Sequence, residues 1–124
     1  MSMLLYPAAE VSRQKGLFRH GGLLLSDGRV VHCAPNRGEH ISSAEEFSAG
    51  KDVTIDRIVE AAEFGPVMCR MVEALRSPQA YDPASNNCEM FLNRVMGRRA
   101  ESPQLQGVAV LLGLGALVGF MSAR

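Results

Sequence analysis

The tripeptide Ser26-Asp27-Gly28 is the feature that most constrains how this chain can fold. It separates two short apolar runs, at residues 23–25 and 30–31. Aspartate starts tight turns and glycine accepts the positive φ angle that such turns need, so the pattern predicts a β-hairpin. A hairpin joins two neighbouring antiparallel strands. We therefore expect an α+β fold in which a small antiparallel sheet packs against helices.

The length of this hairpin loop decides which side chains share a face of the sheet. With a two-residue loop, His20 and His32 fall on opposite faces. With a three-residue loop, Leu25 pairs with Arg29 and the two histidines share a face, close enough for their rings to interact. We predict the three-residue loop because only that register brings the imidazoles together. Cys33 then points to the other face.

The flank of His20 indicates a closely packed site. Gly21 and Gly22 follow it directly, and glycine inside a strand usually marks close approach by another backbone or by a ligand. Leucine and valine occupy both odd-numbered and even-numbered positions of the hairpin strands, and these positions point to opposite faces of the sheet. We therefore expect both faces of the sheet to be covered.

Residues 36–55 are mostly polar and predict loops with short elements between them. Ser43 followed by Glu46 is a capping-box pattern, which favours a helical turn at residues 43–48. A short strand is expected at residues 52–55. His40 falls in this stretch and is interpreted as a loop residue.

Helical spacing of apolar residues resumes at residue 58 and continues to residue 76. Gly65-Pro66 interrupts it, and proline is tolerated at the first position of a helix. We therefore predict a helix break there, with a second helix from residue 66. Nearer the N-terminus, residues 11–15 predict only an edge strand.

Cys88 lies at a predicted helix start. Asn86 is a preferred N-cap residue, and Glu89 lies three positions later, which is the reciprocal capping-box spacing. Cys88 is then the second helical residue. The partial positive charge of a helix start stabilises a thiolate, so we expect a lowered pKa and a nucleophilic sulfur. The helix presents one apolar face, formed by Cys88, Phe91, Leu92 and Val95, and ends at Gly97.

Composition narrows the classes of function. The 124 residues predict one domain, and 13 basic residues balance 13 acidic ones, so we expect no nucleic-acid partner. The three cysteines lack paired spacing, which argues against disulfides and a zinc site and favours a reducing, cytoplasmic compartment. We expect no metal and no cofactor. Cys33 and Cys69 lie in apolar stretches and are interpreted as packing residues.

The C-terminal segment, residues 105–124, is almost uncharged and carries many glycines and aliphatic residues. Residues 105–123 come near the length that crosses the hydrocarbon core of a bilayer. Gly115 and Gly119 have the spacing that lets two helices pair closely in lipid, which predicts a homodimer contact. Two interpretations stay open: membrane anchor and buried core helix.

Four short motifs, in this order and spacing, resemble the lecithin:retinol acyltransferase-like (LRAT-like) family, which includes the H-rev107-type phospholipase/acyltransferases. That family is a circularly permuted branch of the papain-like NlpC/P60 thiol enzymes. The resemblance covers roughly residues 11–104, so we expect a catalytic domain at residues 1–104. The motifs are Arg19-His20, Asp27-Gly28-Arg29-Val30-Val31-His32, Phe47-Ser48-Ala49-Gly50 and Asn87-Cys88-Glu89.

The resemblance implies a thiol acyltransferase or phospholipase that acts on lipid esters through an acyl-cysteine thioester. Cys88 would be the nucleophile, His20 its base, and His32 the residue that orients His20. The partners implied are a phospholipid or another acyl donor, and a membrane surface reached through the C-terminal segment. Two positions depart from the family pattern. Met90 replaces a histidine, and Phe18 lacks an aromatic hydroxyl.

Two alternatives follow from the same residues. The first is a cysteine amidase or peptidase of the NlpC/P60 type, with the same thiol chemistry on a peptide. The second is a membrane-associated interaction protein with a vestigial site, which Met90 and Phe18 motivate. Modification of Cys88 by an acyl donor separates the enzymes from the interaction protein.

Overall fold

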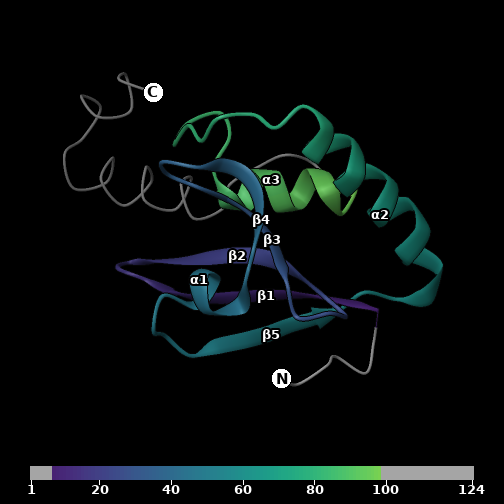
Figure 1. Ribbon diagram of the computed structural model, residues 1–124, viewed down its shortest axis with the longest axis horizontal. Coiled ribbons are helices and arrows are strands. Elements are labelled where there is room, and N and C mark those ends of the chain that lie inside the picture. Colours follow the sequence, from purple (N-terminus) through teal and green to yellow (C-terminus); the bar gives the residue numbers. More distant parts are fainter. Residues whose placement is uncertain (1–6, 99–124) are drawn as a thin grey trace, which may run out of the picture.

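The computed structural model describes residues 7–98 of the chain, and these form one five-stranded antiparallel sheet with three helices (Figure 1). The α+β fold with a small antiparallel sheet is as expected. The strand order is β4-β3-β2-β1-β5. The strands are β1 (Ala8–Lys15), β2 (Phe18–Leu25), β3 (Val30–Ala34), β4 (Gly38–Ser42) and β5 (Val53–Ile58). The helices are α1 (Ala44–Ser48), α2 (Ala61–Arg76) and α3 (Cys88–Val95).

The β2–β3 hairpin has the predicted three-residue loop. The Leu25 backbone N–H donates to the Arg29 carbonyl at 2.8 Å, and Gly28 has a φ of 90°. Leu24 pairs with Val30, which continues the same register into the strands. Since side chains alternate between faces along a strand, this register places the histidines of β2 and β3 on one face.

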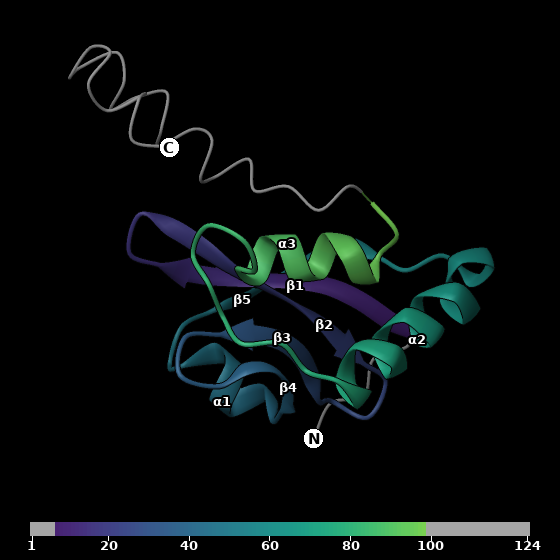
Figure 2. The ribbon, with the colours of Figure 1, turned by 90° about the horizontal axis from the view of Figure 1, so that it is seen from above.

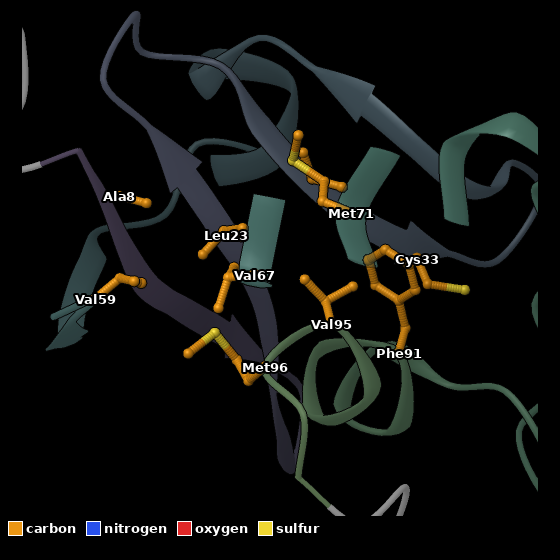
Figure 3. Packing of buried hydrophobic residues seen from close by; sticks show 10 residues of the cluster. Ala8, Leu23, Cys33, Val59, Val67, Met71, Phe91, Val95 and Met96 are labelled. Carbon is orange, nitrogen blue, oxygen red and sulfur yellow. The ribbon is translucent and has the colours of Figure 1, made fainter. Parts of the chain in front are cut away.

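Helices cover both faces of the sheet (Figure 2). Helices α2 and α3 lie on one face, over a core of ten buried residues drawn in Figure 3, among them Leu23, Val31 and Phe91. Helix α1 lies on the other face, where Phe47 packs in a smaller cluster with residues of β1 and β3. Because both faces of the sheet are buried, the hairpin strands carry apolar residues on both of their faces.

Strand β1 corrects the prediction of an edge strand at residues 11–15. It begins at Ala8 and lies between β2 and β5. The sequence does not indicate this central position, because a charged residue such as Glu10 is more common in an edge strand than in a central one. Glu10 is buried, and it is satisfied by ion pairs with Arg57 and Arg98.

The polar stretch at residues 36–55 contains the predicted short helix and also a strand that the sequence did not reveal. The Ser43 side chain caps α1 by accepting from the Glu46 backbone N–H, as expected. The mostly polar residues of β4 predict a loop, but they form a strand in the structure. It pairs with β3 over its whole length, and its buried Glu39 is held by hydrogen bonds.

Helix α2 runs through Gly65-Pro66 without the predicted break. Its start is fixed by Glu60 and Glu63, since the Glu60 backbone N–H donates to the Glu63 carboxylate at 3.1 Å. Proline inside a helix removes one backbone hydrogen bond. The burial of apolar residues further along the same helix offsets that loss, which is why a local breaker did not decide the structure.

Residues 99–124 lie outside the described part of the chain, and so do the candidate anchor at 105–124, the Gly115 and Gly119 pair, and the domain boundary at 104. Within residues 7–98, none of the helices has the length and hydropathy of a membrane-spanning segment.

Candidate functional site

Cys88 opens helix α3 as its first residue, one position earlier in the helix than predicted. The N-cap is Asn87, whose side chain accepts from the Met90 backbone N–H at 2.9 Å. The face formed by Phe91 and Val95 is buried, as expected. Gly97 follows the helix with a φ of 79°, which suits a glycine C-terminal stop.

Asn86, which the sequence indicated as the cap, is instead the centre of a buried polar network. Its side-chain amide nitrogen donates to the Glu39 carboxylate at 2.9 Å and to the Ala80 carbonyl at 3.0 Å. Arg94 of α3 donates to the same Glu39 carboxylate at 2.7 Å. This network ties both ends of α3 to strand β4, and so it fixes the start of the helix where Cys88 lies.

His20 and His32 are buried side by side on the α1 face of the sheet. The Nε2 atom of His20 lies 2.9 Å from Nδ1 of His32, and the ring centroids are 5.0 Å apart. Phe47 of α1 stacks on the His20 ring at 5.2 Å. The predicted contact between the two imidazoles is therefore present.

The hydrogen bonds beyond His32 set the direction of this pair. The Ser42 hydroxyl donates its single hydrogen to the Ser43 carbonyl at 3.0 Å. It can then only accept from His32 Nε2–H, which lies 2.8 Å away. His32 Nδ1 is consequently an acceptor, and His20 Nε2–H donates to it.

This chain of bonds leaves Nδ1 of His20 unprotonated. That atom is buried and has no hydrogen-bond partner in the described part of the chain. Nearly all buried polar atoms in proteins find a partner, so an exception is a candidate site of function. The arrangement makes His20 a neutral imidazole with one free lone pair.

Burial also keeps both imidazoles neutral. It lowers the pKa of His20 to about 4, with a further contribution from the positive charges of Arg13 and Lys15. Burial lowers the pKa of His32 to about 3, and repulsion from His40 and His20 adds to this effect. A neutral imidazole can accept a proton, which a general base must do.

His40 belongs to the same cluster, although the sequence suggested a loop residue. It lies on β4 opposite His32, with the ring centroids 4.2 Å apart. Its Nδ1–H donates to the Gly38 carbonyl at 2.8 Å, and its Nε2 lies 3.7 Å from the Glu46 carboxylate. The turn at Asn36 to Gly38 indicates a second strand after β3. Because alternate residues of a strand share a face, that strand would place His40 and Ser42 on the same face as His32.

The Cys88 sulfur approaches strand β2 from the α3 side. Sγ lies 4.0 Å from the carbonyl oxygen of Arg19, the peptide that immediately precedes His20. Within residues 7–98, neither His20 nor His32 hydrogen-bonds to the sulfur. The structure thus brings the two histidines together and leaves Cys88 beside the backbone of the first.

Strands β2 and β3 pair only at Leu23 with Val31 and at Leu24 with Val30. Beyond these pairs, toward His20 and His32, the two strands are joined through the imidazoles instead of through backbone hydrogen bonds. The sulfur therefore lies at a place where the sheet is not closed by a ladder.

The pKa of the Cys88 thiol is raised, contrary to the expectation for a helix start. Burial is the main cause, while the backbone N–H groups of Gly21 and Glu89 and the charge of Lys15 act in the opposite direction. Desolvation of the thiolate thus outweighs the helix-start effect. The resting pair is a neutral thiol and a neutral imidazole, so a nucleophilic sulfur requires proton transfer at the moment of reaction.

The two glycines after His20 allow close packing from both sides, as predicted. A Cβ at Gly22 would lie 2.7 Å from Val30 and 2.9 Å from the Phe47 ring, both in the cluster that surrounds the histidines. A Cβ at Gly21 would lie 3.3 Å from the Leu92 side chain of α3. The absence of a side chain at Gly22 therefore lets α1 pack close to the sheet, and its absence at Gly21 does the same for α3.

An open groove of about 380 Å³ adjoins the Cys88 end of α3. Gly21 and Glu89, which flank the sulfur, both line it. Most of its other walls are polar or charged: Glu10, Ser12, Arg19, Asp56, Asn93 and Arg98. The groove runs along α3 from Glu89 to Arg98, and Cys88 adjoins one end of it without lining it.

The other two cysteines differ from each other. Cys33 is buried in the α2–α3 core, as predicted, and burial raises the pKa of its thiol to about 12. Cys69 is exposed on α2, so its interpretation as a packing residue was wrong. Val67 and Met71, two positions to either side, are buried in the core, whereas helical spacing turns Cys69 to the solvent.

The chain matches no protein-family model and no curated protein.

Proposed function

We propose that this protein is a thiol acyltransferase or hydrolase with the permuted papain-like NlpC/P60 architecture of the LRAT-like family. Cys88 is the nucleophile, His20 the general base, and His32 the residue that orients His20. The substrate is a lipid ester, and the intermediate is an acyl-cysteine thioester. The single observation that carries this proposal is the directional hydrogen-bond chain, which leaves a buried lone pair on His20, the residue after Arg19, whose carbonyl oxygen lies 4.0 Å from the Cys88 sulfur.

The first half of the reaction transfers the acyl group to sulfur. The Cys88 thiol gives its proton to Nδ1 of His20, and the sulfur forms a bond to the ester carbonyl carbon. The tetrahedral oxyanion receives a hydrogen bond from the Cys88 backbone N–H at the helix start. Collapse of this intermediate breaks the ester C–O bond, and His20 returns the proton to the departing alcohol.

The second half releases the acyl group. Water or an amine attacks the thioester while His20 accepts its proton, and the C–S bond then breaks to regenerate the thiol. The sulfur and Nδ1 of His20 must approach each other for these steps. Because His20 lies on the α1 face of the sheet and the sulfur comes from the α3 side, this approach must pass through the opening between β2 and β3, where the strands are not paired.

Ser42 is a positioning residue in this scheme. Its hydroxyl holds His32 in the Nε2–H tautomer, and His32 in turn holds His20 in the tautomer whose free nitrogen is Nδ1. The role of His32 corresponds to that of the carboxylate or amide that orients the imidazole in other triads. The effect of Ser42 reaches the reacting atoms only through the two imidazoles.

A second candidate function is amide hydrolysis by the same thiol, as in a peptidase. The groove along α3 favours it, because seven of its ten lining residues are polar or charged. Peptide groups and charged side chains of a substrate would find partners there, such as Arg19 and Asp56. The two functions share the nucleophile and differ in the leaving group.

Intact-mass spectrometry of the full chain tests the proposal. A short-chain activated ester is expected to add one acyl group, which maps to Cys88 and is lost in Cys88→Ala. The matched control is Cys69→Ala, which removes an exposed thiol and is expected to keep the adduct. Phospholipid and peptide substrates, compared next, separate esterase from amidase activity. Absence of any adduct on Cys88 would overturn the proposal and leave the non-enzymatic interaction protein.

A further inference from the structure

The turn between β1 and β2 presents apolar side chains to solvent. Leu17 is 92% exposed and Phe18 is 38% exposed. Gly16 precedes them with a φ of 58°, so glycine supplies the left-handed conformation of the turn. The turn therefore does not require leucine at position 17. One exposed leucine alone is ordinary. Its surroundings give this one significance.

Positive charge flanks these side chains. Between residues 11 and 26 the chain carries three basic residues, Arg13, Lys15 and Arg19, and no acidic residue. The ammonium group of Lys15 lies 5.9 Å from the centre of the Tyr81 ring. Apolar side chains surrounded by basic and tyrosine residues are typical of a surface that lies in the headgroup region of a bilayer.

This turn lies at the end of the molecule where the candidate site lies. Arg19, two residues after Leu17, is the residue whose carbonyl is 4.0 Å from the Cys88 sulfur. In Figure 1 the β1–β2 turn and the start of α3 are at the same left-hand end of the sheet. A surface bound by the turn would therefore face the Cys88 end of α3.

We propose that the β1–β2 turn is a membrane contact, in which Leu17 and Phe18 enter the interface of an anionic phospholipid surface. Lys15 then lies among the phosphate and carboxylate groups of the lipid headgroups, while Arg19, whose guanidinium is held by Ser12 and Thr54, adds positive charge beside the turn. The inference rests on exposure and charge, and it does not require the thiol chemistry. It is also separate from the C-terminal segment, which lies outside the described residues.

The shape of the feature favours lipid over a protein partner. A stable protein interface buries roughly 800 Å² on each partner. The turn is a narrow ridge with two apolar side chains, and it is too small to supply such an area. A fluid bilayer needs no complementary surface, because lipids move apart around an inserted side chain.

The chain contains no tryptophan, so one introduced tryptophan reports its own surroundings. The full chain with Leu17→Trp is mixed with phosphatidylcholine vesicles that contain phosphatidylserine, and then with vesicles that also carry brominated lipid. We expect a blue shift of the fluorescence and quenching by the brominated lipid. The matched control is Val72→Trp, at a position on α2 that is 45% exposed, which is expected to show neither change.

The charge requirement is tested in the Leu17→Trp background. Adding Lys15→Gln should raise the vesicle concentration for half-maximal shift by about fivefold, and only when phosphatidylserine is present. No shift at position 17 at saturating vesicles would overturn the proposal, as would an equal shift at position 72. If the proposed function is wrong, mass spectrometry finds no acyl adduct on Cys88, while the fluorescence shift on vesicles is unchanged. The two proposals can therefore fail separately.

Discussion

Burial raises the pKa of the Cys88 thiol, whereas the backbone N–H groups near the helix start lower it. Cysteines that form an ion pair with histidine at rest have a depressed thiol pKa. Here burial raises the pKa of Cys88, and the pKa of His20 is lowered to about 4. Both shifts favour the neutral pair over a thiolate with an imidazolium. The proposed chemistry therefore requires general-base transfer of the thiol proton and does not start from a stored thiolate.

The rate of alkylation of Cys88 tests this conclusion. Because the thiol pKa is raised, reaction with iodoacetamide should be slow at neutral pH and should keep rising above pH 9, the ordinary value for the thiol. The measurement is a pH series of peptide-mapped alkylation in a Cys69→Ser background, which removes the exposed thiol. A rate that is high and constant between pH 5 and pH 8 would show a resting ion pair and contradict this conclusion.

Replacement of Ser42 tests the tautomer chain. In Ser42→Ala, His32 loses the acceptor for its Nε2–H and can turn to the other tautomer, after which His20 no longer presents an unprotonated Nδ1. We expect kcat to fall about tenfold or more with little change in KM. Imidazole ¹⁵N shifts of His20 should change with it. Ser42→Thr, which keeps the hydroxyl, should restore both; a kcat loss with unchanged ¹⁵N shifts would make the role of Ser42 merely structural.

At the scale of elements, the hairpin was predictable because its cause is local. Asp27 and Gly28 fix the loop, the loop fixes the register, and the register places His20 and His32 together. The short helix α1 was predictable for the same reason, since Ser43 caps it from within its own sequence. The register that brings the two imidazoles together is thus set within the hairpin itself.

Other elements depend on contacts that no local pattern contains. Strand β4 is polar because Glu39 binds Asn86 and Arg94, both far along the chain. The cap of α3 moved to Asn87 because Asn86 is used in that network. The pKa of Cys88 depends on burial against β2, which a helix-start argument does not include. The position of the sulfur relative to His20 is likewise a tertiary property.

The approach of α1 to the sheet can be tested at the glycine of β2 that it covers. In Gly22→Ala the new Cβ would meet Val30 at 2.7 Å and Phe47 at 2.9 Å, so we expect a loss of roughly 1–3 kcal/mol in unfolding free energy. Urea titration measures it. Gly21→Ala is the matched control: its Cβ would lie 3.3 Å from the end of the Leu92 side chain and 3.7 Å from the Val11 carbonyl oxygen, so it should cost less. Equal losses would contradict the packing described.

The network between β4 and α3 makes a second prediction at this scale. Glu39 is 2% exposed at its side chain and pairs with Arg94 at 2.7 Å. In Glu39→Ala, the Asn86 amide and the Gln79 backbone N–H also lose their acceptor. We expect about 3 kcal/mol of destabilisation in urea unfolding. Glu73→Ala, which breaks the exposed pair with Arg76, should change stability by less than about 0.5 kcal/mol; similar losses in both would mean that burial of Glu39 contributes little.

For the whole molecule, the buried imidazoles link folding to pH. His20 and His32 have pKa values of about 4 and about 3 in the fold, against the ordinary 6.5 in an unfolded chain. The unfolded chain therefore binds protons first as the pH falls. The stability that these two neutral histidines contribute is present above pH 6.5 and is lost as the pH falls toward their folded values.

Urea unfolding between pH 7 and pH 5 measures this linkage before most carboxylates titrate. Each histidine should lower the unfolding free energy by up to about 1.4 kcal/mol per pH unit below pH 6.5. In His32→Gln one of these contributions is removed, so the pH slope should fall, even though the variant is itself less stable. Arg13 and Lys15 strengthen the effect at His20 through their positive charge, so Lys15→Gln should weaken the slope slightly. A stability that stays constant over this range in the natural sequence would mean that the imidazoles are hydrated in solution. The free lone pair on His20, from which the proposed chemistry begins, would then be occupied by water.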